Sequence, residues 1–319
     1  MVKLENGVYY WQGLNGTQCE IRSRTYNNLK QSFDHITIPY QETYQTWRYK
    51  PIRYNVSGWR AAGRTCMEER DTYKITNYAA VDFNQALDLN LDMVPTNQDR
   101  TKWRPSYPEY IFEREIGYYG SGGSFTTADV DSRWSYFQPT YSSHLVFCPA
   151  PVRKLNTMTP AQLDSYLAGL TVGGTTYHDI GMIWGGRLMS PTGLFASENA
   201  NIPGRPTARH LIFLTDGQTE AFDIAYGAYG VEPLDRRRWD PATSVDSLNT
   251  TVEKRFAVAC NEVKRRNITV WVVAFGTTAN PVMTACAGAQ RTFQANNAAQ
   301  LNAAFDRIAT SMAELRISR

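Results

Sequence analysis

A nearly unbroken apolar run close to the C-terminus constrains the fold of this chain more than any other feature. Residues 268–275 read ITVWVVAF, with β-branched or aromatic side chains at almost every position and no charge. A strand that is apolar at successive positions is covered on both faces, as the central strands of parallel sheets are. The run therefore predicts an α/β fold in which helices flank a mostly parallel sheet.

Strand and helix patterns alternate through the C-terminal part of the chain, from about residue 143. Short apolar strands are expected at residues 145–147 and 211–214. Helices are expected from Pro160, where Thr159 is a good N-cap and Leu163, Leu167 and Leu170 form one stripe, over 179–189, over 243–266 as the longest, and over 301–315. This order of elements again favours a parallel sheet with crossover helices.

The first 142 residues have a different character. They are rich in Tyr, Asn, Arg, Pro and Gly and lack sustained helical periodicity. The strict alternation in Leu87–Met93 predicts one strand with a buried face and a wet face. The glycine-rich segment 120–124 lacks the spacing and the lysine of a phosphate-binding loop, so a flexible tip is expected. We divide the chain into residues 1–142, an aromatic-rich insertion or irregular, partly β region, and residues 143–319, the C-terminal part of an α/β domain.

Composition narrows the classes of function. The chain has 319 residues, 20% of them charged, and a net charge of +3, so charge gives no case for nucleic-acid binding. No apolar stretch approaches the ~20 residues that span a bilayer, so we expect a soluble chain, with any membrane anchor or export signal outside it. Neither a Gly-x-Ser-x-Gly elbow nor a His-Glu-x-x-His motif is present, so a hydrolase has little support.

One candidate site follows from the strand in HLIFLTDG, residues 210–217. Its end places the Asp216 carboxylate at the carboxyl edge of the sheet, where open α/β sheets bind ligands. Thr175, which follows two glycines at the start of another helix, can share a metal ion with that carboxylate. Oxygen ligands of this kind suit Mg²⁺. The alternative is that Asp216 is a turn residue that caps the segment after it.

Five segments carry a family resemblance. They are Phe147-Cys148-Pro149, Gly173-Gly174-Thr175, the string IWGGRLMSP at residues 183–191, Leu214-Thr215-Asp216-Gly217 and Cys286-Ala287, with weaker support from CMEER at residues 66–70. These segments resemble the von Willebrand factor A (vWA) domain, most closely that of the TadG-like proteins of the bacterial Tad (Flp) pilus system. The resemblance covers roughly residues 143–319 and implies a Rossmann-like vWA fold.

This resemblance implies a non-enzymatic protein of the cell envelope, periplasmic or surface-exposed, that acts in pilus assembly, anchoring or adhesion. Its partner would be a protein, either a pilus component or a surface ligand. Contact with a membrane would come only through a segment outside this chain. The family captures ligands at a metal on the sheet edge, where a partner carboxylate completes the coordination. Thr175 and Asp216 match two positions of that metal site.

The third part of that metal site is missing, because no Asp-x-Ser-x-Ser string occurs in the chain. Either the chain lacks the first strand of the domain, or the lineage has lost the site. Thr175 and Asp216 supply too few oxygens to hold Mg²⁺ tightly, so we expect weak or no binding by this chain, with Mg²⁺ possible in the full-length protein. The alternative function is a metal-independent structural or interaction module with a vestigial metal site, which would use the aromatic-rich region and Arg236–Arg238 for contacts.

The five cysteines are Cys19, Cys66, Cys148, Cys260 and Cys286. On the sequence alone, they fit buried thiols as well as they fit two disulfides and one spare thiol. The periplasmic setting implied by the resemblance favours disulfides, with Cys260–Cys286 as the expected pair.

Two polar residues and one basic run near the candidate site have a plain structural interpretation. His178 and Asp179 are expected as ordinary helix-start residues rather than metal ligands. The basic run Arg236–Arg238 is expected in a solvated loop, and contact with an acidic partner or with anionic lipid is its alternative role.

Overall fold

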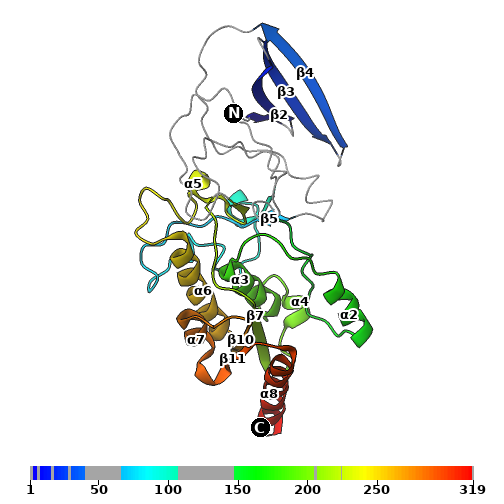
Figure 1. Ribbon diagram of the computed structural model, residues 1–319, viewed down its shortest axis with the longest axis vertical. Helices are drawn as coiled ribbons and strands as arrows, with labels where there is room; N and C mark the ends of the chain where they lie inside the picture. The colour runs from blue at the N-terminus through cyan, green and yellow to red at the C-terminus, as the bar shows by residue number, and fades with distance from the viewer. Residues whose placement is uncertain are drawn as a thin grey trace.

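The computed structural model describes residues 66–106, 147–204, 207–223 and 225–317, together with the backbone of four strands near the N-terminus. These four strands are β1 (Lys3–Glu5), β2 (Val8–Asn15), β3 (Gln18–Asn27) and β4 (Lys30–Pro39). Each strand pairs antiparallel with the next, in the order β1-β2-β3-β4, so the sheet is a simple meander (Figure 1).

A three-stranded parallel sheet forms the centre of the C-terminal half. Its order is β11-β10-β7, with β7 at Arg209–Thr215, β10 at Ile268–Phe275 and β11 at Thr292–Ala295. β10 lies in the middle and pairs in parallel with both neighbours. The central parallel strand predicted from the sequence is therefore confirmed.

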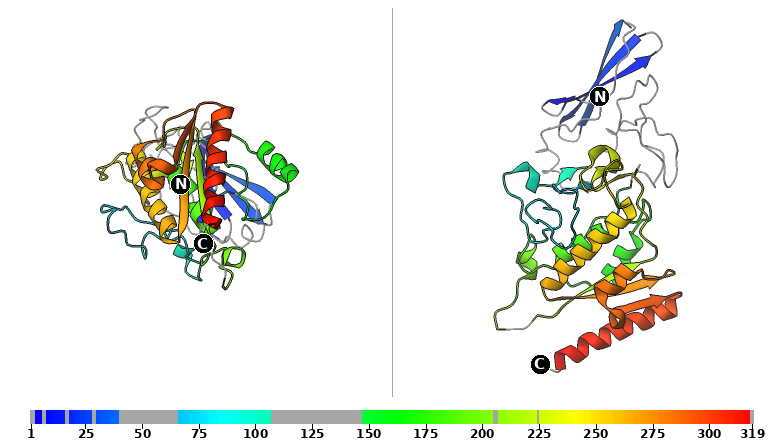
Figure 2. Two further views of the ribbon diagram at one scale, coloured as in Figure 1. Left: turned by 90° about the horizontal axis from the view of Figure 1, so that it is seen from below. Right: turned by 90° about the vertical axis from the view of Figure 1, so that its left-hand side faces the viewer.

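Helices cover both faces of this sheet, as Figure 1 and the right-hand view of Figure 2 show. The longer helices are α2 (Pro160–Ala168), α3 (His178–Met189), α6 (Leu248–Arg265), α7 (Pro281–Ala287) and α8 (Ala298–Ile317). Val270 and Val272 of β10 pack in a core with α3, α6 and α7, whereas Trp271 and Val273 pack against α8. Because successive residues of β10 serve opposite, covered faces, nearly all of them are apolar. The fold is mixed α/β and compatible with a Rossmann-like arrangement.

Short elements complete the described structure. They are β5 (Met67–Glu68), η1 (Asp99–Thr101), β6 (Arg104–Pro105), α4 (Ala196–Asn199), β8 (Tyr226–Gly227), β9 (Gly230–Val231), α5 (Glu232–Asp235) and η3 (Ala289–Arg291). In the part of the chain that the structure describes, no helix combines the length and the hydropathy needed to cross a membrane.

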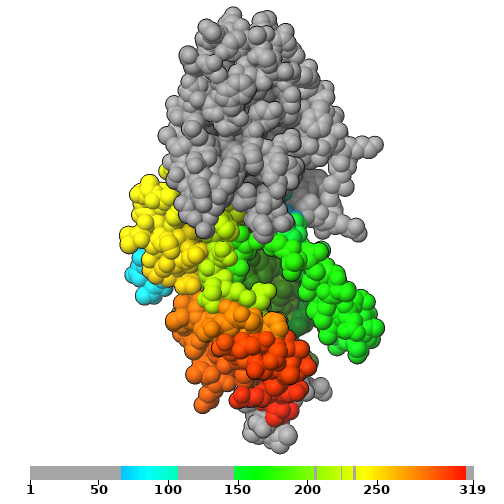
Figure 3. All heavy atoms as spheres, viewed as in Figure 1, coloured from blue at the N-terminus to red at the C-terminus, as the bar shows by residue number. Residues whose placement is uncertain are grey.

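The start of α2 agrees with its sequence signal. The Thr159 hydroxyl accepts a hydrogen bond from Gln162 N, and the Gln162 side chain accepts one from Thr159 N, which is a capping box. The stripe of Leu163, Leu167 and Leu170, however, is 45–52% exposed. α2 projects from the side of the body, in green in Figure 3, and buries none of its residues.

Helix α6 differs from its prediction in extent. It begins at Leu248 rather than at residue 243, because the Ser247 hydroxyl accepts a hydrogen bond from Thr250 N and caps the helix there. Among the described helices, α8 is the longest, with 20 residues against 18 in α6.

Of the two predicted short strands, the structure contains one, and most of the other lies outside the described residues. β7 contains the strand expected at residues 211–214 and lies at one edge of the described sheet, but Leu214 is 51% exposed. Residues 145 and 146 of the other predicted short strand, and the glycine-rich segment 120–124, lie outside the described residues.

The strand predicted at Leu87–Met93 is wrong. These residues form consecutive turns, in which short bonds such as Leu89 N to Ala86 O take the place of a ladder. The leucines are buried, and so is Asp88, which pairs with Arg255. The alternation of apolar and polar residues was misleading, because a strand would have exposed Asp88 to solvent. In the structure Arg255, which is distant in sequence, pairs with Asp88 and neutralises its buried charge.

Two disulfides connect the described segments. Cys260 and Cys286, the pair named from the family resemblance, join α6 to α7. Cys66 and Cys148 are 82 residues apart in sequence. Their disulfide joins residues 66–106, which we call the first described segment, to the chain that leads into α2.

The packing of α3 on α6 makes Gly186 sensitive to substitution. A Cβ atom at this position would lie 2.7 Å from both Leu91 Cδ1 and Val263 Cγ2. We expect Gly186→Val to lower the free energy of unfolding by at least about 2 kcal/mol through overpacking, measured by urea unfolding. Gly169→Val at the exposed end of α2 is the control, and a loss as large there would contradict the packing argument.

Candidate functional site

The loop after β7 is fastened to the start of α3. Thr176 and Glu220 exchange two backbone hydrogen bonds, at 2.9 Å from Thr176 N to Glu220 O and 3.1 Å in return. The Tyr177 hydroxyl donates to the Phe222 carbonyl oxygen at 3.0 Å. Two segments that are 45 residues apart in sequence are thereby held side by side at the carboxyl end of the sheet.

His178, the first residue of α3, completes this attachment. Its ring nitrogens lie 3.0 Å from Thr219 Oγ1 and 3.1 Å from Thr215 Oγ1, and its ring lies edge-on to two phenylalanine rings. Burial lowers the pKa of His178 to about 4, although the negative charge of Asp216 acts in the opposite direction. The imidazole is therefore neutral near pH 7, and it ties the threonines on both sides of Asp216 to α3.

Thr175 and Asp216 consequently lie on adjoining segments at one edge of the sheet. The Asp216 side chain is exposed to solvent. Thr175 Oγ1 is buried and has no hydrogen-bond partner among the described residues. The arrangement offers an exposed carboxylate, with a buried hydroxyl on the adjoining segment, at the position where open α/β sheets bind ligands.

These two residues do not fit a tight magnesium site. Mg²⁺ demands a near-octahedral set of oxygens, of which Thr175 and Asp216 supply only a small part. Across the described ranges, no three His, Cys, Asp or Glu side chains lie close enough together to hold a metal ion.

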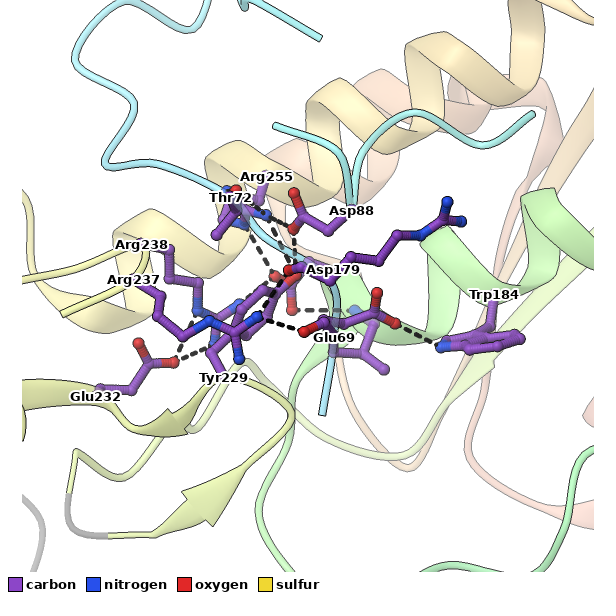
Figure 4. Close-up of polar contacts among 12 residues, drawn as sticks. Glu69, Thr72, Asp88, Asp179, Trp184, Tyr229, Glu232, Arg237, Arg238 and Arg255 are labelled. Atoms are coloured by element: carbon purple, nitrogen blue, oxygen red, sulfur yellow. Dashed lines mark hydrogen bonds and ion pairs between the residues drawn. The ribbon is translucent and has the colours of Figure 1, made fainter. Parts of the chain in front are cut away.

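A group of buried charged residues includes Asp179, the residue that follows His178 in α3. Four carboxylates and four guanidiniums, all almost fully buried, form what we call the buried charge cluster: Glu69, Asp88, Asp179, Glu232, Arg70, Arg187, Arg238 and Arg255. Figure 4 shows most of its members converging from the first described segment, from α3, from the chain around α5 and from α6. Buried charges are costly unless they are paired, so the contacts within the cluster decide whether it stabilises the fold.

Glu69 is the most fully bonded member of the buried charge cluster. Arg187 donates two hydrogen bonds to its carboxylate, at 2.7 and 2.9 Å. The indole nitrogens of Trp184 and Trp103 donate two more, at 2.9 and 3.2 Å. Both oxygens are thus occupied by a bidentate guanidinium and two neutral donors, which is strong compensation for a buried carboxylate.

Asp179 lies at the other end of the cluster. Arg238 binds Asp179 at 2.5 Å and Glu232 at 2.6 Å, while Arg255 pairs with Asp88 and approaches Asp179 at 3.5 Å. Burial raises the pKa of Asp179, and the two arginines act against that rise. Asp179 is a helix-start residue, as expected, but its side chain is an ion-pair partner in the core.

The expectation of a solvated loop at Arg236–Arg238 is wrong for its last two residues. Arg238 is 2% exposed and belongs to the buried charge cluster. Arg237 pairs with Glu68 at 3.0 Å and donates to backbone carbonyls of the same segment. These two arginines are therefore used inside the molecule and are not presented to an acidic partner or to lipid.

The sequence contained a signal for this cluster that motif reasoning missed. Glu68-Glu69-Arg70 and Arg236–Arg238 are compact, opposite charge runs in segments of irregular structure. Trp184 and Arg187 lie three positions apart and therefore on one face of α3. Nothing local showed that these groups meet, because their contacts span more than 100 residues.

Comparisons with protein-family models, with curated proteins and with solved structures gave no match to this chain.

The buried histidine predicts an acid-sensitive stability. The folded pKa of His178 is about 4, below its ordinary value of 6.5, so the unfolded chain binds the proton more readily between these values. Stability should be complete above about pH 6.5 and should fall by up to about 3 kcal/mol as the pH drops towards 4. In urea unfolding at several pH values, His178→Gln should flatten this slope. An unchanged slope would show that the ring does not control it.

The buried ion pair between Glu69 and Arg187 predicts that removal of one of its charges lowers the free energy of unfolding strongly. Glu69→Gln leaves the buried Arg187 guanidinium without its counter-charge, so we expect a loss of about 3–5 kcal/mol in the free energy of unfolding. Asp99→Asn is the matched control, because Asp99 pairs with Lys102 at an exposed position and its loss should be small. Equal losses in chemical unfolding would contradict the importance of the buried pair.

Proposed function

We propose that this chain is a non-enzymatic protein-binding domain of the bacterial cell envelope, a TadG-like vWA module that acts in pilus assembly, anchoring or adhesion. Its binding surface is the sheet edge that carries Thr175 and Asp216. The partner is a protein, either a component of the Tad (Flp) pilus or a surface ligand.

One observation carries the proposal. The contacts of Thr176, Tyr177 and His178 with the loop after β7 bring Thr175 and the exposed Asp216 to one edge. This loop is held from several directions, so the edge is presented in a fixed geometry. A preformed edge loses little conformational freedom on binding, which favours recognition of a folded protein partner.

The two disulfide bonds support the proposed location in the cell envelope. Disulfides persist in oxidising surroundings such as the periplasm and the cell surface, and the described residues form two. An envelope location is therefore part of the proposal. Attachment to a membrane, in this proposal, uses a segment outside the chain.

A metal-independent mode of binding is the second candidate, because Thr175 and Asp216 supply few of the oxygens that Mg²⁺ needs. In this mode the exposed Asp216 carboxylate binds the partner directly, through hydrogen bonds and ion pairs.

The test is binding of the purified chain to purified Flp pilin and to assembled Flp pili, measured by biolayer interferometry. We expect Asp216→Ala and Thr175→Ala to weaken binding at least about tenfold, the loss expected for about 1.4 kcal/mol of contact energy. Asp306→Ala, at an exposed position of α8, is the control and should bind as the wild type does.

The outcomes separate the possibilities. No binding of pilin or pili by the wild-type chain contradicts the pilus role, and equal binding by all variants contradicts the edge as the surface. Loss of binding in EDTA supports metal-assisted capture, whereas EDTA-resistant binding that still needs Asp216 supports direct contact.

A further inference from the structure

Arg70 differs from the other arginines of the buried charge cluster. Its side chain is 0% exposed, yet its one hydrogen bond to the described residues runs from Nη1 to the Met93 carbonyl oxygen, at 2.6 Å. Nε and Nη2, which form one edge of the guanidinium, have no hydrogen-bond partner there. This is the edge that binds carboxylates and other anions in a bidentate way.

The other three arginines each contact a carboxylate. Arg187 binds Glu69, Arg238 binds Asp179 and Glu232, and Arg255 binds Asp88. Buried charges in proteins are almost always paired in this way. Arg70 is the exception within the cluster, since no ion pair joins it to any described acidic residue.

The surroundings of Arg70 are positive and aromatic. Its guanidinium lies 4.1 Å from the centre of the Trp103 ring, and the Arg187 guanidinium lies 5.2 Å from the same ring. Glu69 and Asp88 act on Arg70 electrostatically, but each directs its contacts to another arginine. Burial and the nearby Arg187 outweigh them and lower the pKa of Arg70 to about 10.

We propose that the Nε–Nη2 edge of Arg70, beside Trp103 and Arg187, binds a small monovalent inorganic anion, with chloride as the natural occupant. The anion accepts both N–H groups and gives Arg70 the direct ionic contact that the four carboxylates of the cluster give to the other arginines. A water molecule would accept the same two bonds but would leave the guanidinium without a directly bound counter-charge. Chloride is therefore a structural ligand that binds the folded state and stabilises it. This inference is independent of the proposed function.

The solution test compares sodium chloride with sodium gluconate at equal ionic strength, using thermal unfolding of the oxidised full chain. An anion that binds only the folded state raises the midpoint with concentration. We expect chloride to raise the midpoint by about 2–4 °C over gluconate in the wild-type chain. Arg70→Met should abolish this difference. Arg104→Met, which alters an exposed arginine of the same segment, should retain it.

A crystallographic test keeps the proposal falsifiable even where Arg70→Met fails to fold. Crystals of the wild-type chain grown or soaked in sodium bromide should show an anomalous peak within hydrogen-bonding distance of Arg70 Nε and Nη2. An ordered water at that position without anomalous signal would overturn the proposal. Equal midpoints in chloride and gluconate, or a chloride effect that persists in Arg70→Met, would overturn it as well.

Discussion

The bidentate ion pair between Glu69 and Arg187 is the interaction on which the arrangement of the described chain depends. Glu69 comes from a segment with almost no regular structure, and Arg187 lies on α3, the helix whose first residues form the sheet edge. Two indole donors close the remaining sites of the carboxylate. An ion pair so completely bonded offsets its desolvation, and because it tolerates one geometry it also specifies how the segment packs.

The α/β core was predictable because its signals are local. The apolar run of β10 and the N-cap of α2 each encode their structure within a few residues, and the structure contains both. Leu87–Met93 shows where local reasoning fails, since its alternation is that of a strand. Arg255, 167 residues away, neutralises Asp88 and allows this residue to be buried between Leu87 and Leu89.

In the candidate site, too, the features with local sequence signals were predictable and those that depend on distant contacts were not. Thr175 and Asp216 were placed on one edge by strand ends and helix starts, which the sequence displays. The contacts that hold the edge, such as those of His178 with two threonines, depend on how the loop after β7 folds back. The buried roles of Asp179, Arg237 and Arg238 were not predicted, because a charge run has the same appearance in sequence whether it is solvated or paired.

The disulfide between Cys66 and Cys148 has a mechanical consequence. Cys66 precedes Glu68 by two residues, and Glu68 and Glu69 both form ion pairs with distant arginines. The two cysteines of the disulfide are 82 residues apart in sequence. A pull applied to the chain before Cys66 and after Cys148 passes through this covalent bond and not through residues 67–147. The load therefore bypasses the ion pairs of Glu68 and Glu69, whose strength depends on exclusion of water and would fail soon after solvent entered.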